Sequence, residues 1–172
     1  MTRRPTAYWL YMGLLIAAGL LLFLFESLIP RPLPWFKPGL ANLLTVLALY
    51  RFDSRSAIIV TLGRILLAAL ILGTLFSPMF WLSISAGCSA AMVMAVLYRA
   101  GKRLFSPIGI SLAGAVVHNI TQLLMAGILI VGDAHIFVLL PLLLLPALFT
   151  GPLVGVVAIL ILRRWPGESL PG

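Results

Sequence analysis

The chain has 172 residues, of which 62% are hydrophobic and 9% charged, and its mean hydropathy is +1.17. Soluble domains usually carry about 25% charged residues, so the composition excludes an ordinary soluble domain and predicts a single all-α, polytopic membrane domain over residues 1–172. The net charge of +8 is not arranged as a basic stripe interleaved with exposed aromatics, and we therefore expect no nucleic-acid partner.

Apolar runs near 20 residues recur along the sequence, long enough to cross about 30 Å of hydrocarbon. The first run follows Arg3 and Arg4, spans about 22 residues and lacks a small-residue cleavage site, so we interpret it as a mature helix rather than a signal peptide. Proline, glycine and Ser-Pro breaks divide the chain into six expected helices, at about residues 7–29, 39–52, 54–73, 79–99, 107–131 and 136–164.

The basic residues predict the orientation of these helices. With six crossings and the N-terminus inside, only Arg31 and Lys37 lie at the outer face, and nine basic residues lie at the inner face. Such a bias predicts cytoplasmic termini in a bacterial-type inner membrane, with the basic residues against anionic headgroups. The last helix, 136–164, contains three prolines, and we expect it to be a kinked single crossing. The nine inner residues are Arg3, Arg4, Arg51, Arg55, Arg99, Lys102, Arg103, Arg163 and Arg164.

The second expected helix is short. Its 14 residues would reach only about 21 Å, so its amino end should lie below the outer surface of the membrane. Helix amino ends present unpaired N–H groups and partial positive charge, which suit an anion. Lys37 adjoins this end and Asn42 lies in its first turn. The alternative is a helix that begins late because Pro38 stops it.

Arg64 lies near the middle of the third expected helix, where an arginine costs roughly 2.5–3.5 kcal/mol on insertion scales. It must therefore face the bundle or a wet cavity. Of the four acidic residues, Asp53 and Glu168 fall on the inside, Asp133 falls in an outer turn, and Glu26 could approach only if the third helix is shifted. We expect Arg64 to lack a carboxylate partner and to rely on carbonyls and amides at helix ends or on a bound anion.

His118, Asn119 and Gln122 form a polar group within the fifth expected helix. Their i, i+3 and i, i+4 spacings place them on one side of that helix. Polar groups in lipid need partners, and interhelical hydrogen bonds supply them. Three adjacent polar side chains at one depth indicate either a lined cavity or contacts that hold neighbouring helices together, and the sequence leaves both readings open.

Several chemical signatures are missing from the sequence. It has no aspartate-rich motif, P-loop, Cys/His cluster or Ser/His/Asp set, and its single cysteine is Cys88. Four scattered acids do not provide a Mg²⁺ site for a diphosphate. We expect no catalytic residues, no metal and no cofactor, and coupling to ATP would need another subunit.

Four segments resemble one membrane family, the heptaprenyl diphosphate synthase component I family, also called the Gx transporter family. They are KPGLANLLTVLALY (37–50), GRILLAALILG (63–73), LSISAGCSAAMVM (82–94) and IGISLAGAVVHNITQLLMA (108–126). The resemblance covers about residues 7–164. That family is similar to the substrate-binding S-components of energy-coupling-factor transporters, which are six-helix proteins that bind a vitamin-like ligand and associate with an ATPase-driven module.

The resemblance implies two functions. The similarity to S-components implies a membrane-embedded substrate-binding or transport subunit for a small anionic or amphipathic, isoprenoid-like molecule, working with an ATPase-driven energy-coupling module. The family label implies instead a non-catalytic accessory subunit that assists a soluble polyprenyl diphosphate synthase in isoprenoid or menaquinone biosynthesis. A third reading is a purely structural assembly protein. The candidate substrate-binding residues are Lys37, Asn42, Arg64, His118, Asn119 and Gln122.

Overall fold

The computed structural model describes residues 6–28, 39–101 and 105–165. These residues form helices and turns with no strand, which confirms the all-α prediction for this part of the chain. The elements are α1 (Thr6–Leu28), α2 (Asn42–Arg51), α3 (Ser54–Ile71), α4 (Pro78–Ala100), α5 (Pro107–Ala126), a π-helical turn η1 (Gly127–Val131), a 3-10 segment η2 (Ala134–Leu139) and α6 (Leu140–Arg164).

Five of the described helices are long and apolar enough to cross a membrane: α1, α3, α4, α5 with η1, and η2 with α6. The prediction of six transmembrane helices is therefore supported for five. The remaining helix, α2, has ten residues, or about 15 Å. It begins later than expected because Gly39 adopts a left-handed conformation (φ 83°) and its carbonyl accepts the first hydrogen bond, from the Asn42 N–H at 3.0 Å.

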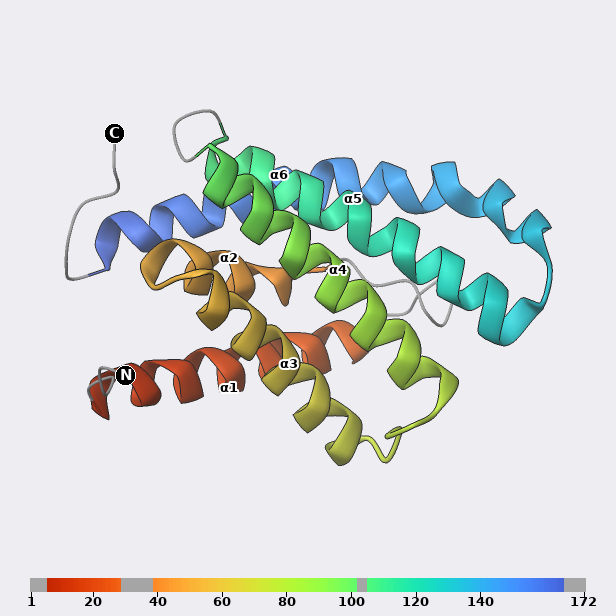
Figure 1. Cartoon of the computed structure of the whole chain (residues 1–172), viewed down its shortest axis with the longest axis horizontal. Helices are drawn as coiled ribbons and strands as arrows, with labels where there is room; N and C mark the ends of the chain where they lie inside the picture. The colour runs from red at the N-terminus through yellow and green to blue at the C-terminus, as the bar shows by residue number, and fades with distance from the viewer. Residues whose placement is uncertain (1–5, 29–38, 102–104, 166–172) are drawn as a thin grey trace.

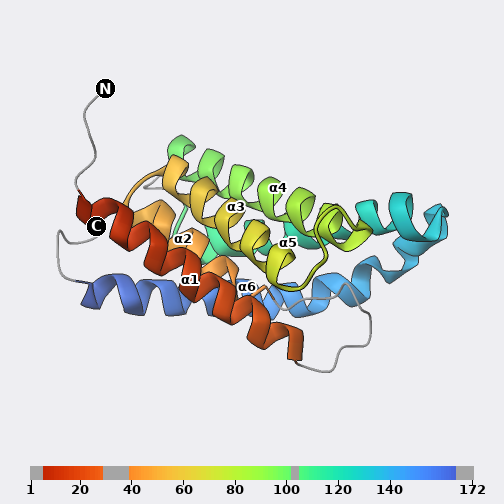
Figure 2. The same cartoon turned by 90° about the horizontal axis from the view of Figure 1, so that it is seen from below.

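The short helix α2 forms the centre of the bundle. It contacts each of the five long helices, and seven of its ten residues are buried. In Figure 1 it lies behind α3 and α4, and in Figure 2 it lies between α1 and the layer formed by α4 and α5. Because it is enclosed by protein, its backbone can begin within the bundle instead of at the membrane surface.

The helix ends gather at two opposite ends of the bundle. The start of α1, the α2–α3 turn, the end of α4 and the end of α6 lie together, and the α3–α4 and α5–α6 turns lie at the other end (Figures 1 and 2). The first group contains Arg51, Arg55, Arg99, Arg163 and Arg164. This clustering is the arrangement that the charge pattern predicts, and the side of the membrane that it faces stays a prediction.

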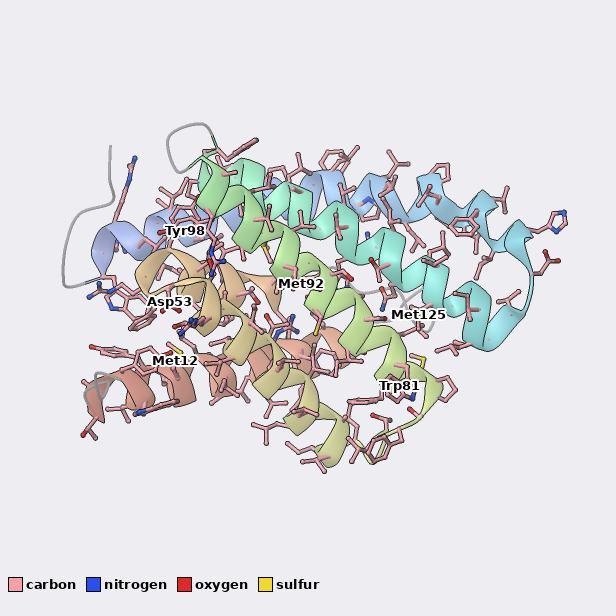
Figure 3. The ribbon with its side chains drawn as sticks, viewed as in Figure 1. Met12, Asp53, Trp81, Met92, Tyr98 and Met125 are labelled. Atoms are coloured by element: carbon pink, nitrogen blue, oxygen red, sulfur yellow. The ribbon has the colours of Figure 1, made fainter. Side chains whose placement is uncertain are left out.

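Side-chain caps begin three of the long helices. Asp53 caps α3, and its carboxylate accepts from the Ser56 N–H at 2.7 Å and the Ser56 hydroxyl at 2.8 Å. Ser77 and Ser106 cap α4 and α5, and each is followed by proline at the first helical position, where proline is well tolerated. Figure 3 shows Asp53 at the end of the bundle where α2 meets α3.

The helices α5 and α6 form a closely packed pair. A Cβ added to Gly155 would lie 2.4 Å from the Ile108 Cα, and one added to Gly151 would lie 2.8 Å from the Leu112 Cα. Only glycine permits this approach of two helix backbones. The last predicted helix is one continuous element from Leu140 to Arg164, with Pro146 and Pro152 inside it, and not a hairpin.

Candidate functional site

A cavity lies beside the amino end of α2, in the middle of the bundle. The empty space between its atoms is about 340 Å³, including the part that opens to the outside. The centre of a water molecule can occupy only about 20 Å³ of this space, which is room for about one water. Five helices and the turn before α2 contribute to its wall. The lining residues are Phe23, Glu26, Gly39, Ala41, Asn42, Arg64, Ile65, Ser83, His118 and Gln122.

Arg64 enters this cavity from α3 and is only 4% exposed. Its Nη2 donates a hydrogen bond to the Asn42 Oδ1 at 2.9 Å, and its Nε has no hydrogen-bond partner among the described residues. The side chain passes next to Gly19 of α1, where an added Cβ would lie 3.1 Å from the Arg64 Cδ. The structure therefore ties Arg64 to the first residue of α2, while the buried Nε–H of the guanidinium has no partner among the described residues.

Glu26 brings a carboxylate to the cavity that Arg64 lines, while the hydrogen bond of Arg64 goes to an amide, that of Asn42, as the sequence predicted. This side chain of α1 is 1% exposed. Its Oε1 also accepts a hydrogen bond from the Leu40 N–H, just before α2. The physical reason is the packing of α1 against α3: Gly19 touches the Arg64 stem, and Glu26 follows two helical turns later on the same face of α1.

The three polar residues of α5, namely His118, Asn119 and Gln122, lie in two different environments. His118 and Gln122 line the cavity. Asn119 does not; its Nδ2 donates to the Leu143 carbonyl of α6 at 2.7 Å, and its side chain is buried in that contact. Both readings of the sequence therefore apply, because the two residues at i, i+4 spacing face the cavity while the intervening amide joins α5 to α6.

The remaining candidate and one unforeseen residue complete the site. Lys37 lies outside the described residues. Ser83 of α4 lines the cavity although sequence reasoning did not select it, because its stretch also contains Ser85 and Ser89 and nothing in the sequence distinguishes the three hydroxyls. Gly39 and Asn42 also line a second, smaller space of about 160 Å³ on the side of α5 and α6, together with Ser111 and Thr150.

The chemistry of the cavity follows from these side chains. One guanidinium and one carboxylate face it, and the other polar groups are amides, a hydroxyl and an imidazole. Such a wall can donate and accept hydrogen bonds to a small polar group, while Phe23, Ala41 and Ile65 provide apolar contacts. Within the described ranges, no three His, Cys, Asp or Glu side chains gather closely enough to hold a metal ion.

Comparisons with known proteins give one match. A family model described as heptaprenyl diphosphate synthase component I matches residues 15–161, a range that includes every described residue of the cavity. No curated protein and no solved structure matches the chain. Because the family model covers most of the sequence, the chain belongs to the heptaprenyl diphosphate synthase component I family.

Proposed function

We propose that this protein is a membrane-embedded substrate-binding subunit of a transporter for a small anionic or amphipathic, isoprenoid-like molecule. The observation that carries the proposal is the meeting of polar side chains from five helices at one buried cavity. Those side chains are Glu26, Asn42, Arg64, Ser83, His118 and Gln122.

The free-energy cost of placing these polar residues inside membrane-spanning helices supports a binding role. Ionisable side chains in membrane-spanning helices are expensive, and they usually mark a pathway or a ligand site. Helix association alone needs only local pairs, such as the Thr45 and Thr61 hydroxyls 2.8 Å apart between α2 and α3. Arg64 departs from such pairing, because it is buried and its Nε has no partner among the described residues. A ligand oxygen would satisfy that donor.

The size of the cavity limits which part of a ligand it can bind. Its interior has room for about one water, so it accommodates the polar end of a ligand and not a whole isoprenoid. The apolar remainder would lie between helices or toward lipid, where long hydrocarbon is well solvated. Binding of this kind suits an amphipathic molecule that reaches the protein from the membrane.

The proposal includes a partner and an orientation. By similarity to S-components, we infer association with an ATPase-driven energy-coupling module in the inner membrane, with both termini in the cytoplasm. The cluster of five arginines at one end of the bundle supports this orientation through the positive-inside rule.

The family match favours a second candidate function. The description of the family as heptaprenyl diphosphate synthase component I supports a membrane component of such a synthase, which would act as a non-catalytic accessory to a soluble subunit. Co-purification with such a subunit and an increase in its activity would support this function. Synthase activity that is the same with and without this chain would remove it.

The experiment that tests the first proposal is native mass spectrometry of the purified protein. We expect a small molecule to be retained by the unaltered chain and to be lost from Arg64→Ala and Gln122→Leu, provided that both variants elute as folded protein. Retention of the same mass by both variants would contradict the proposal. No retained molecule, together with a map in which side chains fill the cavity completely, would favour the purely structural role.

A further inference from the structure

The corner of the cavity that should attract anions already holds a carboxylate. Two features of the wall favour negative charge, namely the buried guanidinium of Arg64 and the Leu40 N–H just before α2. Glu26 lines the same cavity as Arg64, and its Oε1 accepts from the Leu40 N–H. The chain therefore supplies its own anion at the position where the short helix predicted an external one.

The formal charges of the lining residues limit the class of ligand that the cavity can bind. The described lining residues include one arginine and one glutamate, so their formal charges sum to zero when His118 is neutral. A diphosphate would bring further negative charge next to Glu26, inside a site where water screens charges poorly. Hydrogen-bonding groups without net charge do not meet this repulsion, and the amides of Asn42 and Gln122 and the hydroxyl of Ser83 suit them.

We infer that the cavity takes an uncharged polar group, a hydroxyl or a carbonyl, at the end of an apolar molecule, and that Glu26 excludes anionic head groups. The Nε–H of Arg64, which is buried and has no hydrogen-bond partner among the described residues, donates to the oxygen of that group. This inference rests on the proposed binding function, and it selects the uncharged amphipathic ligand over the anionic one. It also places Glu26 as the residue that determines specificity.

The first test compares two probes that share one apolar chain and have small polar ends, geranylgeraniol and geranylgeranoate, because a diphosphate is larger than a cavity with room for about one water. Their affinities for the unaltered protein in neutral detergent are measured by titration calorimetry. We expect the alcohol to bind roughly tenfold more tightly or better, because like charges in a desolvated site repel strongly. Carboxylate binding that equals or exceeds alcohol binding overturns the inference, as does binding of neither probe together with failure of the second test.

The second test uses geranylgeranoate and changes only the charge of the glutamate. Glu26→Gln keeps the shape of the side chain and an oxygen for the Leu40 N–H, so we expect its affinity for this carboxylate to rise roughly tenfold or more over the unaltered chain. The double variant E26Q/R64Q should lose that gain, and Glu26→Asp, which keeps the charge, should show none. A folded E26Q protein without any gain overturns the inference.

The outcomes separate this inference from the proposed function. If Arg64→Ala and Gln122→Leu keep the retained molecule, the binding function fails whatever the carboxylate probe does. If that molecule is lost from both variants but the unaltered chain binds the carboxylate tightly through Arg64, the binding function stands and the role of Glu26 is wrong. Should E26Q not fold, the comparison of alcohol and carboxylate on the unaltered chain decides alone.

Discussion

Two groups of buried polar residues in this bundle behave differently. The first consists of closed contacts between two elements: Tyr8 and Ser56 hydroxyls 2.9 Å apart, Thr45 with Thr61, and Asn119 with the Leu143 carbonyl. In the second group, residues from five helices surround a cavity at the amino end of α2. Both groups are rich in polar atoms, but only the second encloses space.

The difference shows that a buried polar residue in a membrane protein must be interpreted by the number of hydrogen-bond partners it needs. A single hydroxyl or amide finds one partner on a neighbouring helix and stabilises the contact by about 0.6 kcal/mol on average. An arginine has five donors in a fixed fork, and no single neighbour can satisfy it. Arg64 therefore needs several elements around it, and this need organises α1, α2 and α3 around the cavity.

The largest expected effect comes from Arg64→Ala. Arg64→Ala removes the positive charge that shares the cavity with the Glu26 carboxylate, and leaving a buried charge uncompensated typically costs about 3–5 kcal/mol. We expect a loss of that order in the free energy of unfolding, measured by titrating the purified protein with denaturing detergent while following helix content by circular dichroism.

The control for this variant removes both charges at once. The double variant E26Q/R64Q leaves no uncompensated charge, so it should recover most of the stability that Arg64→Ala loses. Recovery would assign the cost to charge and not to lost packing of the arginine stem against Gly19. A loss below about 1 kcal/mol in Arg64→Ala would show that the cavity group is no more coupled than a surface ion pair.

An intermediate effect is expected on the closed side of the molecule. In Gly155→Ala the new Cβ would lie 2.4 Å from the Ile108 Cα, so α5 and α6 must move apart. Overpacking of this kind typically costs about 1–3 kcal/mol. The same unfolding titration measures the loss, and ligand retention should survive because neither residue lines the cavity.

Gly13→Ala is the matched control for that substitution. Nothing lies within 4 Å of a Cβ at Gly13 of α1, and alanine in a helix interior is favoured over glycine by roughly 0.5–1 kcal/mol. We expect unchanged or slightly raised stability. Equal losses in both variants would mean that the close approach of α5 and α6 does not limit their packing.

Much of the fold could be predicted from the sequence because its determinants are local. The Ser-Pro pair at 106–107 predicts the start of α5, and the structure confirms Ser106 as the cap. Composition and run length predict the five long helices. The start of α2 was placed too early, since the left-handed turn at Gly39 and the enclosure of α2 by its neighbours are tertiary features.

The cavity could be predicted only in part. Asn42, Arg64, His118 and Gln122 were selected because polar residues within apolar runs are costly, and the structure brings these four together. The placement of Glu26 in the same cavity as Arg64 was missed, because position along a helix does not give depth when two helices cross. The three polar residues of α5 share one side of the helix, but a sequence does not say which of them meets α6.

The smallest expected effect on stability separates the two groups most sharply, because it uses two amides on one helix. Asn119→Leu removes the hydrogen bond to the Leu143 carbonyl and should lower the free energy of unfolding by about 0.6 kcal/mol, and by no more than about 1.7. The molecule retained in native mass spectrometry should stay bound. Gln122→Leu, three residues later, should cost little stability and lose that molecule.

The variants Asn119→Leu and Gln122→Leu distinguish the closed contacts from the cavity, because each substitution changes one of the two and leaves the other intact. Leucine is close in size to both amides and belongs in an apolar helix, so the two variants share the same change in helix α5 and differ only in the neighbour they face. If Asn119→Leu also released the bound molecule, the α5–α6 contact would belong to the binding site, and the boundary between closed contacts and cavity would move to include α6. If both variants retained the bound molecule, the cavity residues would only hold helices together, like the closed contacts.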